Sequence, residues 1–371
     1  MSLLDALINT EHPESGPQCP EGKMAGLHRL LALLALALGT VAVSVAEEKA
    51  KDADLRSLPC PDPQDISPCV CTVDVQHNMD IDCSQVESED QLAQVFSSNI
   101  PFPKFNKLVI YRNPHLMVLR NGDLGPASFQ IIEVTDGVLE EVQDGALSVS
   151  YSTATWIDLQ RNRLSKFPFH EIPSFTALTT LWLSGNSLPE FPLITSDSLT
   201  NIGLNFNYFG EIPLNGFQGV KNVNIIDVDG NGITTIVPGT FTDLPHLRYL
   251  FLSFNRLSEI PAGAIEFHGH GILSLDHNNI NKIAVGAITG LGDGDVYLNE
   301  NSLTVLDEDV FGAFLSAGAT LEIDDNPLGC GCEIAWLVTN SAYMSLISPG
   351  ASCYDGELLA NLDPTIYEDF C

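Results

Sequence analysis

Residues 178–188 read Leu178-Thr-Thr-Leu181-Trp-Leu183-Ser-Gly-Asn186-Ser-Leu188, and residues 247–257 repeat that order as Leu247-Arg-Tyr-Leu250-Phe-Leu252-Ser-Phe-Asn255-Arg-Leu257. When the chain is aligned on the asparagine, Gly137 takes its place once and the other copies fall at Asn113, Asn162, Asn186, Asn207, Asn231, Asn255, Asn278, Asn301 and Asn326. Successive copies are 21 to 25 residues apart. A period of this length indicates coils that stack on one another.

Both quoted copies match the phrase L-x-x-L-x-L-x-x-N-x-L of leucine-rich repeats. Leu181 and Leu183 lie two residues apart, so on a strand both face the core, whereas Trp182 between them is expected to point into solvent. One coil cannot bury its leucines alone, but a stack of coils can. The sequence therefore predicts a curved leucine-rich-repeat solenoid of about ten repeats, with a parallel β-sheet on the concave face and an irregular or short-helical convex side.

Eight of the nine cysteines flank the repeats in two sets of four. The sets are Cys60, Cys69, Cys71 and Cys83, then Cys330, Cys332, Cys353 and Cys371. They predict a disulfide-stapled N-terminal cap over 60–100 and a C-terminal cap over 328–371, with repeats over 101–327. Each set allows three pairings. Four cysteines could also bind zinc, but C-x-C pairs match zinc hooks poorly.

The N-terminal residues are expected to be absent from the mature protein. Residues 1–23 are a polar upstream extension with the ninth cysteine, Cys19. Residues 24–46 have the basic start, apolar run and small-residue ending of a secretory signal peptide, with an uncleaved anchor as the alternative. Translation would then start at Met24 rather than Met1, and 47–59 form a charged linker. We expect a secreted, extracellular product with no membrane span in its mature form.

The formal net charge of −32 argues against nucleic acid as a partner, because binding to phosphates needs a basic stripe. No Lys or Arg follows Lys282, whereas acidic residues continue to Asp369. One interpretation is that the acidic residues only keep a secreted protein soluble. The alternative hypothesis is that they attract a cationic partner to the C-terminal half of the chain.

Candidate catalytic and metal motifs fail on inspection. Asp227-Val-Asp229-Gly-Asn231 resembles the opening of a calcium loop, but its twelfth position is Pro238 rather than Glu. His268, His270 and His277 are close in sequence but fall beside turns. Without a nucleophile–base arrangement, we expect no enzyme activity, catalytic residue, cofactor or metal.

The outward positions of the strands are the candidate binding surface, because aromatic side chains there can anchor a protein partner. The predicted partner-binding residues are Trp156, Trp182, Phe206, Asp227, Asp229, Tyr249, Phe251, Phe254 and Tyr297.

The N-terminal cap carries a more specific resemblance. Leu58-Pro-Cys60-Pro-Asp-Pro-Gln-Asp-Ile-Ser-Pro-Cys69-Val-Cys71, Met79-Asp-Ile-Asp-Cys83 and Gln91-Leu-Ala-Gln-Val-Phe96 are similar to the non-catalytic, leucine-rich-repeat subunits of oplophorus-luciferin 2-monooxygenase, the luciferase of luminous shrimp. In that family a separate small subunit oxidises coelenterazine. The resemblance implies a non-catalytic partner subunit of a luciferase-type complex; a soluble pattern-recognition or adhesion protein is the alternative. From cysteine-capped extracellular repeats it also implies the pairs Cys60–Cys71, Cys69–Cys83, Cys330–Cys353 and Cys332–Cys371.

Overall fold

A computed structural model describes residues 59–371, within the compact unit Ser57–Cys371. The upstream extension, the signal peptide and all but the last residue of the linker lie outside the described residues. Among the residues described, no helix combines the length and the apolar character needed to cross a membrane.

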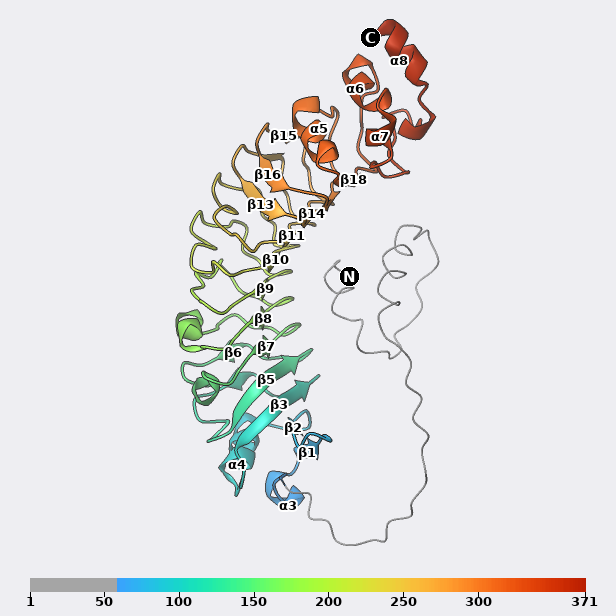
Figure 1. The fold of residues 1–371 in the computed structure, drawn as a ribbon. Helices are drawn as coiled ribbons and strands as arrows, with labels where there is room; N and C mark the ends of the chain where they lie inside the picture. Colours follow the sequence, from blue (N-terminus) through green and yellow to red (C-terminus); the bar gives the residue numbers. More distant parts are fainter. Residues whose placement is uncertain (1–58) are drawn as a thin grey trace, which may run out of the picture. The chain divides into compact units, whose positions relative to one another are not determined.

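One sheet of 12 strands runs through the unit (Figure 1), and every neighbouring pair is parallel except β1–β2. Its strands are β1 (Val70–Val73), β2 (Met79–Asp82), β3 (Lys104–Tyr111), β5 (Ser128–Thr135), β7 (Trp156–Asp158), β8 (Thr180–Trp182), β9 (Asn201–Gly203), β10 (Ile225–Asp227), β11 (Tyr249–Phe251), β14 (Ile272–Ser274), β17 (Asp295–Tyr297) and β18 (Thr320–Glu322). In Figure 1 they line the inner side of a curved stack.

The register of the sheet places the middle residue of each short strand beside its equivalent in the next coil. These residues are Ile157, Leu181, Ile202, Ile226, Leu250, Leu273, Val296 and Leu321. All are buried in one hydrophobic core that continues from cap to cap. The predicted leucine-rich-repeat solenoid is therefore confirmed.

The convex side contains more strand than the sequence predicts. Three parallel two-stranded sheets form there: β4 (Val118–Leu119) with β6 (Glu141–Val142), β12 (Glu259–Ile260) with β15 (Lys282–Ile283), and β13 (Ile265–Gly269) with β16 (Ile288–Leu291). Isoleucines align in register, as Ile260 with Ile283 and Ile265 with Ile288, and β-branched residues favour strands. The helical segments of this side are η2 (Ser148–Ser150), η3 (Phe169–Ser174) and α5 (Glu308–Ser316).

Both caps close the ends of the core. The N-terminal cap contains α3 (Pro63–Ile66), β1, β2 and α4 (Glu89–Ser97), and β2 pairs with the first repeat strand, β3. The C-terminal cap contains η4 (Cys332–Ile334), α6 (Ala335–Val338), α7 (Ser341–Met344), η5 (Leu359–Asn361) and α8 (Pro364–Phe370). The disulfides are Cys60–Cys71, Cys69–Cys83, Cys330–Cys353 and Cys332–Cys371, the pairs that the resemblance implies.

Candidate functional site

The residue before each of the nine repeat asparagines, and before Gly137, has a left-handed backbone, with φ between +52° and +63°. We call these ten positions the left-handed row: Arg112, Asp136, Arg161, Gly185, Phe206, Gly230, Phe254, His277, Glu300 and Asp325. The N–H groups of the first nine donate to a carbonyl of the next coil, as Phe254 N does to Asp276 O at 3.1 Å. The row thus continues the hydrogen-bond ladder beyond the ends of the concave strands.

Side chains of the left-handed row touch their neighbours along the stack. Arg161 forms a bidentate ion pair with Asp136, at 2.8 and 2.9 Å. The Phe254 ring stacks on the His277 imidazole, with centroids 4.2 Å apart and planes 17° from parallel. His277 Nδ1 in turn lies 2.8 Å from Glu300 Oε2. The row therefore contains two groups of side chains in contact, Asp136 with Arg161 and Phe254 with His277 and Glu300.

Phe206 and Phe254 occupy this row although glycine suits it better. A non-glycine residue in the left-handed conformation costs about 1–2 kcal/mol. Gly185 and Gly230 hold equivalent positions in neighbouring repeats without that cost. Burial does not account for the phenylalanines either, because Phe206 is 43% and Phe254 48% exposed. Large apolar rings held in a strained backbone at the surface point to binding.

The other predicted residues follow the outward rows of the sheet. Trp156 lies on β7 and Trp182 on β8, with ring centroids 6.3 Å apart. Asp227 on β10 is beside Phe251 on β11, in the strand that also carries Tyr249. Ser274 on β14 is paired with Phe251 on one side and with Tyr297 of β17 on the other. Tyr297 therefore lies two strands away from Phe251.

Exposure corrects part of the sequence analysis. Trp182, Phe251, Asp227 and Asp229 are at most 2% exposed, so the expectation that they point into solvent is wrong. Trp182 and Phe251 nevertheless lie outside the hydrophobic core cluster, as expected of outward positions. Trp182 is shielded because Gly203, its neighbour in register, lacks a side chain and lets the indole lie against the sheet. Trp156, Tyr249 and Tyr297 are half-buried.

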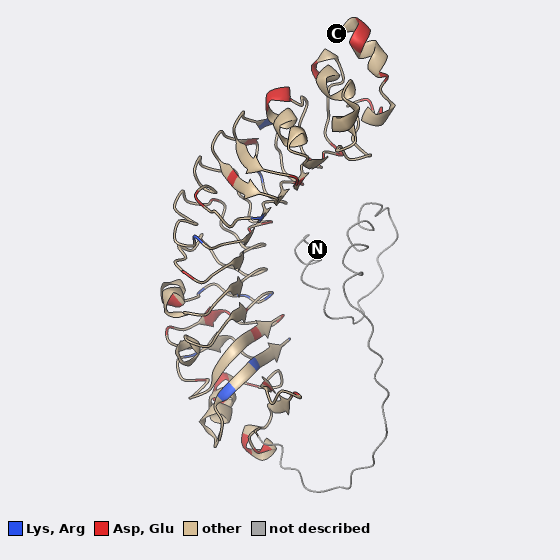
Figure 2. Ribbon diagram, in the orientation of Figure 1, with Lys and Arg blue, Asp and Glu red and all other residues tan. Residues whose placement is uncertain are grey.

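The last two concave strands each carry one acidic residue and no basic one, Asp295 on β17 and Glu322 on β18 (Figure 2). Burial, followed by the charges of Asp324 and Asp295, raises the pKa of Glu322. Burial, with the charges of Asp295, Glu322 and Asp276, raises the pKa of Tyr297 to about 12. No Lys or Arg follows Lys282, so no basic residue of the later chain balances these acidic groups.

Unsatisfied polar atoms lie around Trp182. Within residues 59–371, the indole Nε1 atoms of Trp156 and Trp182 and the amide Oδ1 of Asn205 are buried with no hydrogen-bond partner. Near them, burial raises the pKa of Asp158 to about 6, although Gln160 donates to its carboxylate. Buried indole N–H groups usually find an acceptor. This part of the face has hydrogen-bonding capacity that the described protein atoms do not use.

Sequence reasoning missed His277 as a neighbour of Phe254 in the left-handed row. It weighed His277 only as a metal ligand and did not connect it with Phe254. Gly185 and Gly230, directly before their asparagines, are a sequence signal of the left-handed row, since glycine adopts a positive φ without steric cost.

Comparisons with known proteins agree with this architecture. The leucine rich repeat family matches residues 197–257. The non-catalytic subunit of oplophorus-luciferin 2-monooxygenase from Oplophorus gracilirostris is 35% identical over 329 residues, covering 86% of this chain and 92% of the relative. The chain belongs to this family. It is accordingly a non-catalytic leucine-rich-repeat protein.

More distant matches share the repeat architecture. Lumican from Gallus gallus is 24% identical over 141 residues, 37% of this chain and 41% of lumican. Among solved structures, a chain of the octameric complex of Latrophilin 3, Unc5D and FLRT2 superposes with a TM-score of 0.60 at 20% identity, covering 74% of this chain and 86% of that one. This similarity concerns the fold alone.

Proposed function

We propose that this protein is the non-catalytic partner subunit of a luciferase-type complex and binds a protein through the concave face and the left-handed row. Membership of a family named for a non-catalytic subunit supports the assembly. Four disulfides support an oxidising, extracellular compartment, where such bonds persist.

The observation that carries the proposal is the exposure of Phe206 and Phe254 in left-handed backbone. Neither the core nor the backbone benefits from a phenylalanine there. Aromatic anchors bury a large area at low cost in conformational entropy, so they dominate the binding energy of many interfaces. The unsatisfied indole N–H groups nearby and the acidic end of the sheet give polar contacts around the anchors.

Binding measurements with the catalytic monooxygenase subunit test the proposal. We expect saturable binding to the immobilised full chain, weakened more than about tenfold in the double variant Phe206→Ala, Phe254→Ala, because two anchors are removed. Tyr354→Ala is the matched control, since Tyr354 is an exposed aromatic in the C-terminal cap. Absence of binding, or an affinity that the double variant leaves unchanged, would refute the proposal.

A further inference from the structure

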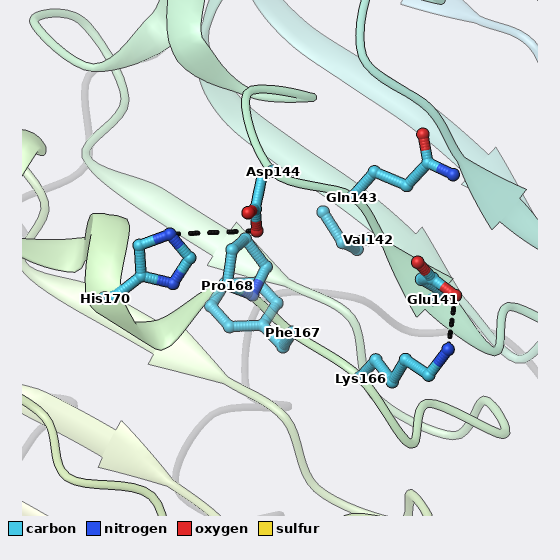
Figure 3. Close-up of a pocket in the computed structure, with 8 residues that line it drawn as sticks. All are labelled: Glu141, Val142, Gln143, Asp144, Lys166, Phe167, Pro168 and His170. Carbon is cyan, nitrogen blue, oxygen red and sulfur yellow. Dashed lines mark hydrogen bonds and ion pairs between the residues drawn. The ribbon is translucent and has the colours of Figure 1, made fainter.

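Away from the concave sheet, three potential metal ligands meet on two successive coils. Asp144, His170 and Glu171 each place a ligand atom so that all three atoms lie within 4.8 Å of one another. Asp144 and His170 also line a cavity of about 430 Å³ whose walls include Phe167 and Pro168 (Figure 3). Their separation of 26 residues hides the cluster from a search for sequence motifs.

The stacking of the two coils brings these residues together, with Asp144 and His170 exposed and Glu171 partly buried. Asp144 follows β6, and His170 and Glu171 belong to the 3₁₀ helix η3 of the next coil. Gly145 N donates to Glu171 Oε1 at 2.7 Å, which fixes the carboxylate from across the coil boundary. Hydrogen bonds that orient a ligand in this way are typical of metal sites.

A second contact joins the same coils at the far side of the cavity. Glu141 and Lys166 form a parallel bridge, and Lys166 Nζ lies 3.0 Å from Glu141 Oε2 (Figure 3). Lys166 is therefore engaged by Glu141 and does not neutralise the cluster.

The charge and chemistry of the cluster favour a cation. His170 Nε2 is 3.7 Å from Asp144 Oδ1, and a neutral imidazole adds no positive charge to the two carboxylates. One imidazole and two carboxylates suit Zn²⁺ and similar transition-metal ions, whereas Ca²⁺ and Mg²⁺ prefer oxygen ligands alone.

We propose that Asp144, His170 and Glu171 bind a divalent transition-metal ion of the Zn²⁺ type. The ion links two neighbouring coils and retains one position for water. The proposal is independent of partner binding, because these residues lie on the convex segments rather than on the concave strands.

Metal titration of the full chain after chelator treatment tests this site. We expect one equivalent of Zn²⁺ by calorimetry, an absorption spectrum of bound Co²⁺, and a higher melting temperature with Zn²⁺. His170→Ala and Asp144→Asn should each weaken Zn²⁺ binding about tenfold or more. Neither variant touches the Gly145–Glu171 hydrogen bond, and an unchanged melting temperature without metal would show that both fold normally.

His268→Ala is the matched control for loss of a surface imidazole. His268 Nε2 lies 3.7 Å from Glu266 Oε1, so it is paired with a carboxylate but is not part of the three-ligand cluster. Its loss should leave the Zn²⁺ affinity unchanged. Failure of the wild-type chain to bind Zn²⁺ below about 1 mM overturns the proposal. Equal affinity of His170→Ala, Asp144→Asn and the wild type does so as well. Neither result bears on binding of the catalytic subunit.

Discussion

The amide side chain of each repeat asparagine connects neighbouring coils. Asn255 Nδ2 donates to Val228 O in the previous coil and to Leu252 O and Ser253 O in its own. Its Oδ1 accepts from Asn231 N and Ile233 N, both at 3.0 Å. One buried side chain thus satisfies backbone groups on two coils, which explains why the sequence repeats an asparagine rather than any other polar residue.

Asn255→Ala should lower the free energy of unfolding by about 2–5 kcal/mol, because two buried N–H groups lose their acceptor. Asn222→Ala removes an exposed amide with one hydrogen bond, to Asp197 O, and should change stability by less than about 1 kcal/mol. Urea denaturation monitored by circular dichroism measures both. Equal effects of the two substitutions would contradict the bridging role of Asn255.

At the scale of elements, glycines allow backbones to approach where β14 and β17 begin. A Cβ on Gly294 would overlap Gly271 O and lie 2.8 Å from Gly271 C, and backbone atoms cannot turn aside as a side chain can. Asp295 N also donates to Gly271 O at 3.0 Å, so separating the coils would weaken the ladder.

Gly294→Ala should therefore destabilise the chain by more than about 2 kcal/mol. Gly312→Ala is the control, and we expect it to raise the free energy of unfolding rather than lower it. Gly312 lies in α5, where an added Cβ meets Glu308 Cγ at an ordinary 3.5 Å, so the higher helix propensity of alanine should stabilise by about 0.5–1 kcal/mol. The same denaturation experiment compares them, and a neutral Gly294→Ala would show that the close approach is dispensable.

The features that could be predicted are those that the sequence pattern within one coil determines. Leu181 and Leu183 could be assigned to the core from their spacing alone. The pairing of β13 with β16 was not predictable, because it depends on how one coil is aligned with the next. The burial of Trp182 depended likewise on Gly203, a residue of the following coil.

At the scale of the whole molecule, the stack of coils has a concave surface formed by the large sheet and a convex surface formed by the connecting segments. The continuous core requires every coil, so the concave face is assembled from residues far apart in sequence, such as Phe206 and Phe254. The aromatic candidates could be predicted to lie at outward positions. Which of them are exposed could not be predicted, because neighbouring coils cover some of these side chains and leave others open to solvent. The lack of Lys and Arg after Lys282 further gives the C-terminal half an acidic character.

Hydrogen–deuterium exchange of the chain with and without the catalytic subunit tests most directly whether the concave face is the interface. We predict slower exchange on binding in peptides spanning 203–209, 249–256 and 272–279, which carry Phe206, Phe254 and His277, and unchanged exchange in the convex strands β13 and β16. Protection confined to the convex strands or to the two caps, with none around Phe206 and Phe254, would contradict the account.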